Sequence, residues 1–242
     1  MISKANIQLV KGLQDKKLRQ KYGQFIVEGE KSIAELLKSP YKVTKLFAVS
    51  EWLNNNQLDL KQAQVFEVTD QELKQLSTHF APQKVLALVQ MPDWSNHKSK
   101  GPWVIGLDAI QDPGNLGTII RIADWYGIDT IICSIGCTDV YAPKCINSTM
   151  GSFLRVKVIY GDILKYAQLV DLPLVVADFN GINIHKGPLP NKGILVIGNE
   201  GHGVDQVLLN HAAYELTIPK FGQAESLNAA VSAAILLDRL KA

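Results

Sequence analysis

The chain has 242 residues, of which 47% are hydrophobic and 20% are charged, and its formal net charge at pH 7 is +2. This composition is ordinary for a globular protein with a sizeable core, and it excludes a disordered or fibrous chain. The most apolar stretch, residues 229–237, is too short to span a membrane, and residues 1–13 lack the apolar core of a signal peptide. We therefore expect a cytoplasmic protein without a membrane segment.

The N-terminal 24 residues have a high local density of positive charge. Six basic residues stand against one acidic residue, Asp15, which gives a local charge of +5; the basic residues are Lys4, Lys11, Lys16, Lys17, Arg19 and Lys21. Such a segment suits a polyanion such as RNA. A solvated basic helix face would give the same pattern.

The first part of the chain alternates between short strands and helices. Strands are predicted at residues 25–27, 45–49, 65–68 and 85–90, with helices at 30–37 and 70–76. Residues 91–102 are polar and contain two prolines and a glycine. We therefore place a linker at 93–102, between a domain of residues 1–92 and a second domain of residues 103–242.

The second part predicts an α/β domain. Its strands are expected at residues 103–107, 130–134, 156–160, 174–177, 194–197 and 215–218. These runs are apolar rather than alternating, which favours a parallel sheet covered by helices on both faces. Helices are expected at residues 118–126, 207–211 and 229–240.

The three cysteines, Cys133, Cys137 and Cys145, do not indicate a disulfide framework. Their spacing matches no zinc pattern, so no metal site is expected. No activating neighbour is visible for a catalytic thiolate, and we interpret all three as packing residues.

Ligands of open parallel sheets bind beyond the carboxyl ends of the strands. The first turn (residues 108–117) contains Pro113, Gly114 and Gly117 and leads into a helix that carries Arg121. A cation near the start of a helix is disfavoured by the helix dipole. Arg121 is therefore expected to have a carboxylate or phosphate partner, unless it is an ordinary surface residue.

The second turn (residues 198–203) has the spacing G-x-x-G-x-G, which differs from the G-x-G-x-x-G of dinucleotide binders. Glycines let a ligand approach the backbone closely. The acidic Glu200 would repel a pyrophosphate, so a neutral or cationic ligand is favoured. An ordinary strand-to-helix connection is the alternative interpretation.

The third turn (residues 218–228) leads into an alanine-rich helix. Ser226 or Asn228 would be a good N-cap, but capping explains only one of them. The small residues of the helix permit a close helix approach, within the chain or across a dimer; they are Ala229, Ala230, Ala233 and Ala234.

Together the three turns resemble the signature motifs of the SpoU/TrmH family of RNA ribose 2′-O-methyltransferases, in the SPOUT class. The matching residues are Asn115-Leu-Gly117 with Arg121, Ala123 and Gly127, then Gly198-Asn-Glu200-Gly201 with Gly203, then Ile218-Pro219, Gly222 and Glu225-Ser226-Leu227-Asn228. Residues 17–29 are similar, more loosely, to the opening of the family's small α/β RNA-binding domain. One departure is STMGS at 148–152, where Met150 is bulkier than the family's usual small residue.

The resemblance implies a parallel-sheet domain with a C-terminal trefoil knot, a homodimer formed through that domain, and S-adenosyl-L-methionine as cofactor. It implies two sets of site residues and an RNA-facing segment. Cofactor contacts are expected from Ala177, Ile197, Gly198, Ile218 and Leu227. The reaction site is expected to comprise Asn115, Arg121, Glu200, Ser226 and Asn228, and RNA contacts are expected from Lys16, Lys17, Arg19 and Lys21.

The predicted reaction is methylation of the ribose 2′-hydroxyl of RNA, with ribosomal RNA favoured over transfer RNA. Arg121 is expected to position a phosphate, because its high pKa makes it a poor base. Glu200 is expected to be either the base or the partner that holds Arg121. The alternatives are a non-catalytic ribosome-assembly factor of the same fold and a nucleotide-dependent oxidoreductase, which the glycine spacing disfavours.

Overall fold

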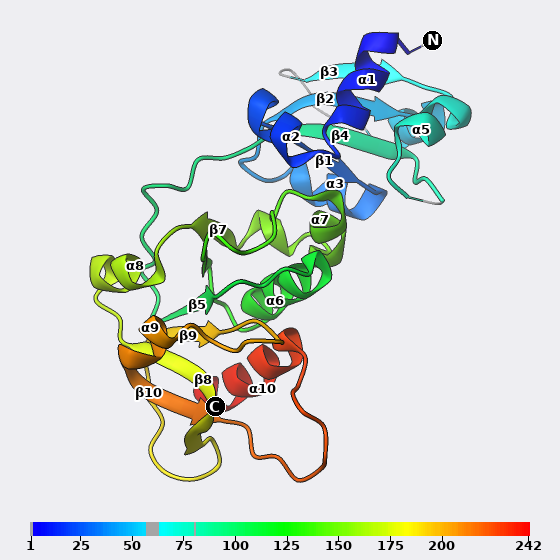
Figure 1. Ribbon diagram of the computed structural model, residues 1–242. Coiled ribbons are helices and arrows are strands. Elements are labelled where there is room, and N and C mark those ends of the chain that lie inside the picture. Colours follow the sequence, from blue (N-terminus) through cyan, green and yellow to red (C-terminus); the bar gives the residue numbers. More distant parts are fainter. Residues whose placement is uncertain (1, 57–62, 80) are drawn as a thin grey trace. The chain divides into compact units, whose positions relative to one another are not determined.

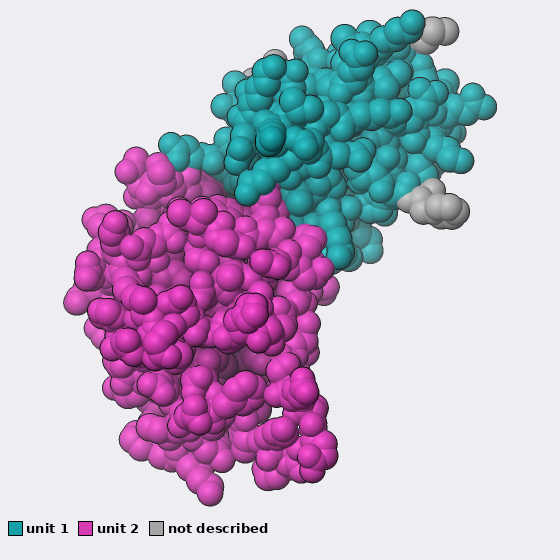
Figure 2. All heavy atoms as spheres, in the orientation of Figure 1, with its two compact units in different colours: residues 1–93, 141–154 teal, residues 94–140, 155–242 magenta. Residues whose placement is uncertain are grey.

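The structure, a computed structural model, describes residues 2–56, 63–79 and 81–242. It divides into two compact units (Figure 2). Unit 1 comprises residues 1–93 and 141–154, and unit 2 comprises residues 94–140 and 155–242. Within the described ranges, no helix combines the length and the apolar character that a membrane span requires.

Unit 1 is built on a four-stranded sheet of order β1-β4-β2-β3 (Figure 1). The strands are β1 (Gln24–Glu28), β2 (Val43–Ala48), β3 (Gln64–Glu67) and β4 (Val85–Gln90). β4 runs antiparallel to both β1 and β2, while β2 and β3 are parallel. The helices are α1 (Lys4–Gly12), α2 (Lys16–Tyr22), α3 (Glu30–Leu36), α4 (Ser50–Asn55) and α5 (Asp70–Leu76). All four predicted strands and both predicted helices are present, and α1, α2 and α4 come in addition.

The basic N-terminal segment forms two capped helices. The Ser3 side chain accepts a hydrogen bond from Asn6 N at the start of α1, and Asp15 accepts from Lys17 N and Leu18 N at the start of α2. Such side-chain caps satisfy amide groups that have no partner inside the helix. α2 ends at Gly23, whose φ of 59° suits glycine.

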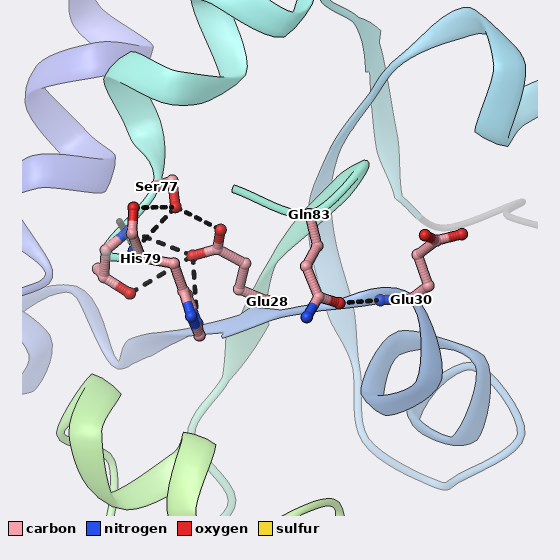
Figure 3. A network of polar contacts seen from close by, with 6 residues as sticks. Glu28, Glu30, Ser77, His79 and Gln83 are labelled. Atoms are coloured by element: carbon pink, nitrogen blue, oxygen red, sulfur yellow. Dashed lines mark hydrogen bonds and ion pairs between the residues drawn. The ribbon is translucent and has the colours of Figure 1, made fainter. Parts of the chain in front are cut away.

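A buried carboxylate joins the end of β1 to the residues that follow α5 (Figure 3). Glu28 accepts hydrogen bonds from Ser77 Oγ and, at 3.2 Å, from Thr78 N, and His79 Nε2 lies 3.8 Å from its carboxylate. Nearby, Gln83 Oε1 accepts from Glu30 N at 3.2 Å. A buried charge is tolerated when hydrogen bonds replace its lost hydration, so this network fixes the edge of unit 1.

A segment from the second half of the sequence belongs to unit 1. Residues 141–154 form α7 (Pro143–Thr149) and a 3-10 turn (Ser152–Leu154). The Phe25 ring lies 4.6 Å from the Tyr141 ring and 6.0 Å from the Phe153 ring, measured between centroids. Tyr41 Oη donates to Phe153 O at 3.0 Å. Aromatic packing of this kind anchors α7 on the sheet of unit 1.

Gly151, the glycine of STMGS that this chain shares with the family pattern, is required on steric grounds. Gly151 has a φ of 92°, and a Cβ placed there would lie 3.1 Å from a carboxylate oxygen of Glu35. Met150, the departure from the family pattern, ends α7 in the left-handed conformation, and its side chain is 67% exposed. The bulkier side chain is therefore accommodated in solvent.

Unit 2 contains a six-stranded sheet of order β10-β8-β9-β5-β6-β7, and every neighbouring pair is parallel. The strands are β5 (Trp103–Leu107), β6 (Thr130–Cys133), β7 (Lys157–Tyr160), β8 (Leu174–Asn183), β9 (Gly193–Ile197) and β10 (Ala212–Thr217). The predicted parallel α/β fold is confirmed. β8 continues six residues beyond its predicted end at 177, because its extension pairs with Leu216 and Thr217 of β10.

Helices cover the sheet of unit 2, and their bounds are α6 (Pro113–Trp125), α8 (Ile163–Val170), α9 (Gln206–Asn210) and α10 (Ala229–Lys241). One core cluster joins apolar side chains of β5, β6 and β9 to Ile163 and Tyr166 of α8 and Leu208 of α9. α10 packs against α6, as Figure 1 shows, and these two helices also contact β9 and β6, respectively.

Residues 94–102, which lie in the expected linker, are held against unit 2. Trp94 packs on the core cluster, and Lys157 Nζ lies 5.8 Å from the centre of its ring. Ser99 N donates to Tyr166 Oη at 3.0 Å, and His97 Nε2 lies 3.0 Å from Thr130 Oγ1. This stretch therefore has a fixed conformation rather than that of a free tether.

Candidate active site

A hollow of about 610 Å³ lies in unit 2, and its lining comes from the middle of β8, from the carboxyl ends of β9 and β10, and from the turns that follow these two strands. All five residues expected to contact the cofactor line it, namely Ala177, Ile197, Gly198, Ile218 and Leu227. Glu200 and Ser226 of the expected reaction site line it as well. The placement agrees with the rule that parallel sheets bind ligands at the carboxyl ends of their strands.

The second turn closes on itself through backbone contacts. Asn199 N donates to Gly203 O at 3.0 Å, and Gly203 N donates to Asn199 O at 2.8 Å. A Cβ added at Gly198 would lie 2.2 Å from the carbonyl carbon of Gly203, and Gly203 itself has a φ of 72°. These two glycines are therefore required by the shape of the turn itself, in addition to any ligand that approaches it.

Asn199 fastens the second turn to the first. Its Nδ2 donates to Ala109 O at 2.9 Å, and its Oδ1 accepts from Gly201 N at 2.8 Å. Ala109 has a φ of 53°, which is uncommon for a residue other than glycine. In addition, Asp108 Oδ2 accepts from Asp205 N at 2.9 Å. The two turns therefore form one rigid rim.

A hydrogen-bonded chain of three side chains joins all three turns. Asn115 Nδ2 donates to Glu200 Oε1, and Asn228 Nδ2 donates to Asn115 Oδ1 at 2.9 Å. Asn228 Oδ1 accepts from Ala230 N at 2.9 Å and from Val231 N at 3.3 Å, so Asn228 is the N-cap of α10. One asparagine thus caps a helix with its oxygen and orients Asn115 with its nitrogen. The structure brings together three of the five expected reaction-site residues in this chain.

Arg121 lies deeper in its helix than the sequence predicts. The first turn was expected to precede its helix, but α6 already begins at Pro113, with Asp112 as N-cap accepting from Asn115 N at 2.8 Å. Proline is favoured at the first helical position because its missing N–H has no helical partner there. Arg121 lies eight residues after Pro113, beyond the reach of the N-terminal dipole.

Arg121 is also not held by Glu200, whose carboxylate accepts from Asn115 instead. Its side chain is exposed, and among the described residues none forms a hydrogen bond or an ion pair with it. Of the two partners that were expected, the carboxylate is therefore not found within the described chain. A phosphate from outside the chain is consistent with the exposed guanidinium.

Cys137 lies beneath the first turn. Ile110 N donates to its Sγ at 3.3 Å, and the thiol donates to Leu107 O at 3.2 Å. A hydrogen bond from Cys133 lowers the pKa of Cys137. The side chain is nevertheless buried, as are those of Cys133 and Cys145, which agrees with the interpretation of the cysteines as packing residues.

The four expected RNA contacts lie on α2 and differ in exposure. Lys16, Lys17 and Lys21 are exposed, whereas Arg19 is only 3% exposed. Arg19 Nη1 donates to Leu13 O at 2.9 Å and to Gln14 O at 2.8 Å, which holds the turn between α1 and α2. Its burial makes Arg19 unavailable for direct contact with RNA, and this corrects the expectation for that residue.

Several lining residues were not singled out from the sequence. Asp178 and Phe179 lie on the part of β8 beyond its predicted end, Leu209 lies on α9, and Leu216 lies on β10. Asn199 was visible only as part of a motif. Its role depends on the carbonyl of Ala109, ninety residues away in the chain, and no local sequence signal indicates such a contact.

Comparison with known proteins places this geometry in a family. Residues 102–238 match the SpoU rRNA Methylase family, and residues 4–87 match the MRM3-like substrate binding domain. The 23S rRNA (guanosine(2553)-2′-O)-methyltransferase RlmP of Bacillus subtilis is 34% identical over 235 residues, which cover 96% of this chain and 94% of that protein.

Solved structures agree with the sequence matches. An RNA methyltransferase of the TrmH family from Porphyromonas gingivalis is 32% identical, with a TM-score of 0.88 over 99% of this chain and 98% of that one. The AdoMet-bound rRNA methyltransferase from Sinorhizobium meliloti is 26% identical, with a TM-score of 0.88 over 100% and 96% of the two chains. With more than half of its residues matched to the family and a similar relative along nearly its whole length, the chain belongs to the SpoU rRNA methylase family.

Proposed function

We propose that this protein transfers a methyl group from S-adenosyl-L-methionine to the ribose 2′-hydroxyl of ribosomal RNA. The observation that carries the proposal is the hydrogen-bonded chain Glu200–Asn115–Asn228 at a hollow lined by the second and third turns. Family membership and the names of the similar proteins support the reaction class.

The hollow fits the cofactor in charge and in character. Three lining residues are acidic and one is a lysine; they are Asp178, Glu200, Glu225 and Lys220. An acidic lining favours a cationic sulfonium over a phosphorylated nucleotide. Apolar side chains for the uncharged part of the ligand come from Ile197, Leu209, Leu216, Ile218 and Leu227. We assign the cofactor contacts to Ala177, Ile197, Gly198, Ile218 and Leu227.

In the proposed mechanism, S-adenosyl-L-methionine supplies an activated methyl group whose transfer needs no acid. The ribose hydroxyl must be placed in line with that methyl group, and its proton must pass to a base or to water. Asn115, fixed on both sides by Glu200 and Asn228, is suited to orient the hydroxyl or a neighbouring backbone group of the RNA. Arg121 is assigned to the adjacent phosphate, and Ser226 to the rim of the hollow.

Glu200 is assigned an orienting role, because its carboxylate already accepts from Asn115 Nδ2. The Glu200→Gln variant keeps an acceptor oxygen but cannot take up a proton at neutral pH. The pH–rate profile of this variant should therefore keep the acidic limb of the wild-type profile, with turnover lowered less than about tenfold. Loss of that limb together with turnover would instead identify Glu200 as the base.

The substrate is proposed to be ribosomal RNA because the two relatives that are named for a particular nucleotide of 23S rRNA match nearly the whole chain. The relative from Bacillus subtilis is named for guanosine 2553 of 23S rRNA, and one from Streptomyces viridochromogenes, 27% identical, is named for uridine 2479 of 23S rRNA. The two relatives are named for different nucleotides. The proposal therefore names the class of RNA and the ribose 2′-hydroxyl, and no particular nucleotide.

The test is methyl transfer from radiolabelled S-adenosyl-L-methionine to unmodified 23S rRNA, 16S rRNA and bulk tRNA, followed by mapping of ribose methylation. Labelled 2′-O-methylnucleotides in ribosomal RNA alone are expected. Label in tRNA alone would show that the substrate is tRNA and would contradict the proposed substrate. Binding of RNA without any transfer, in the presence of the cofactor, would favour a non-catalytic assembly factor.

We further propose a homodimer formed through unit 2, a trefoil knot through which the third turn passes, and a cytoplasmic location. Exposed apolar side chains on the packed pair α6 and α10 support the dimer, chiefly Trp125 and Val231. The knot rests on the family resemblance of the third turn. The cytoplasmic location is supported by three cysteines that remain free thiols.

A further inference from the structure

A second hollow, of about 580 Å³, lies within unit 1. Its walls come from three places in the sequence: the turn between α1 and α2, Thr78 after α5, and one face of α7. The lining residues are Gln14, Thr78, Pro143, Lys144, Asn147 and Ser148. Its volume is within the range of hollows that hold small ligands or parts of larger ones.

The walls of this hollow are fixed by packing and hydrogen bonds. α7 is held by the contacts of Tyr141 and Phe153 with Phe25. Thr78 is held by Glu28, whose carboxylate accepts from Thr78 N. Gln14 lies in the turn that the buried Arg19 holds, because Gln14 O accepts from Arg19 Nη1 at 2.8 Å. The side chains are thus presented by a preformed surface.

The lining is suited to an anionic polar ligand. Lys144 is the one charged residue among the six, and Gln14 and Asn147 offer amide groups, while Thr78 Oγ1 already donates to Glu28 at 3.4 Å and Ser148 Oγ to Lys144 O at 2.8 Å. Lys16 and Lys17, both exposed, follow Gln14 by two and three residues, and the exposed Asp15 lies between them and Gln14. Phosphate contacts from lysines, combined with amide and hydroxyl contacts, are the pattern by which proteins hold RNA backbones and unstacked nucleotides.

We propose that this hollow binds an unpaired nucleotide of the RNA substrate, with Lys144 on its phosphate and the amide side chains on its base or ribose. The inference rests on the proposed function. The match to a substrate binding domain covers residues 4–87 and does not include α7. The proposal thus assigns an RNA contact to a helix that the sequence places inside the methyltransferase half.

The experiment compares three full-length proteins in methyl transfer to 23S rRNA. The test variant is Lys144→Ala combined with Asn147→Ala, and the charge-matched control is Lys38→Ala. Lys38 is exposed, lies in the same unit and does not line the hollow. Thermal unfolding and the affinity for S-adenosyl-L-methionine, measured by calorimetry, verify that each variant is folded.

The test variant is expected to raise KM for RNA about tenfold, while kcat and cofactor affinity stay within about twofold of wild type. The control is expected to match wild type in all three quantities. A second measurement keeps the result independent of turnover: wild-type protein crosslinked to 23S rRNA containing 4-thiouridine should yield a crosslinked peptide within residues 141–154.

An unchanged KM in the test variant, with no crosslink in this segment, would overturn the hollow as an RNA site and leave the proposed function intact. A wild-type protein that transfers no methyl group to any RNA would overturn the proposed function first. These two failures are distinguishable because the wild-type reaction is measured before any variant. A tenfold rise in KM shared by Lys38→Ala would also overturn the proposal, since general charge would then explain it.

Discussion

Arg121 is assigned to the RNA phosphate next to the reacting ribose, and the structure leaves its side chain exposed for that contact. Its guanidinium is exposed and is not held by Glu200. Arg121→Ala is therefore expected to lower kcat about 100-fold through loss of RNA positioning. Cofactor affinity by calorimetry should stay within about twofold, and the melting temperature should be unchanged. A folded variant that no longer binds S-adenosyl-L-methionine would contradict this role.

The two glycines 198 and 222 offer a matched comparison within one site. A Cβ at Gly198 would collide with the backbone of Gly203, whereas a Cβ at Gly222 has no atom within 4 Å. Gly198→Ala must therefore displace the second turn. We expect it to weaken cofactor binding at least tenfold, in line with the roughly 1–3 kcal/mol cost of overpacking.

Gly222→Ala, by contrast, is expected to bind the cofactor with wild-type affinity. Isothermal calorimetry on both variants measures the difference directly. Equal losses in the two variants would mean that the glycines serve the ligand rather than the shape of the second turn.

Among the helices, α10 depends on Asn228, which caps the helix with its side-chain oxygen and donates to Asn115 with its side-chain nitrogen. Asn228→Ala removes the N-cap of α10 and the donor to Asn115, so it should lower both the free energy of unfolding, by about 1 kcal/mol, and the turnover. Asn228→Asp keeps the capping oxygen but loses the Nδ2 donor. It should therefore retain wild-type stability while turnover falls about tenfold or more.

Chemical denaturation and single-turnover methyl transfer separate the two tasks of Asn228. If stability and turnover rose and fell together across both variants, the contact with Asn115 would have no function of its own.

Elements whose signal is local could be predicted from the sequence. The strands of unit 2 are apolar runs bounded by turn residues, and all six were found at or near the expected positions. The first turn was misplaced because Pro-Gly-Asn is typical of turns, yet Pro113 fits the first position of a helix when Asp112 caps it. Local residue preference favours both structures, and the tertiary position of α6 decides between them.

Long-range contacts account for what the sequence did not predict in the site. The three turns are expected to meet because strand ends of a parallel sheet share one edge, and hydrogen bonds join one residue from each of them. The direction of each side chain was not predictable, because Glu200 bonds to a residue 85 positions away and Asn228 to one 113 positions away. Arg19 was assigned to RNA by its charged neighbours, while its burial depends on carbonyl groups in the preceding turn.

For the whole molecule, the proposed dimer makes a direct prediction. Trp125 on α6 is 85% exposed. Large aromatic residues are enriched at protein interfaces, so an exposed tryptophan marks a candidate interface. Trp125→Asp should convert the dimer to a monomer in sedimentation velocity. The control, Leu169→Asp, changes an exposed leucine on α8 and should leave the dimer intact. A monomeric wild-type protein, or a dimer that survives Trp125→Asp, would exclude this face as the interface.

The assignment of residues 141–154 to unit 1 has a consequence for synthesis on the ribosome. The chain passes from one unit to the other three times, after residues 93, 140 and 154. Phe25 and Tyr41 emerge from the exit tunnel long before Phe153, the residue that covers them. The amino-terminal domain therefore cannot reach its final packing when its own strands are complete. In nascent unit 1 the rings of Phe25 and Tyr41 stay uncovered by Phe153 while β5, α6 and β6 are translated. A gene fragment ending at codon 93 would therefore encode an incompletely packed unit.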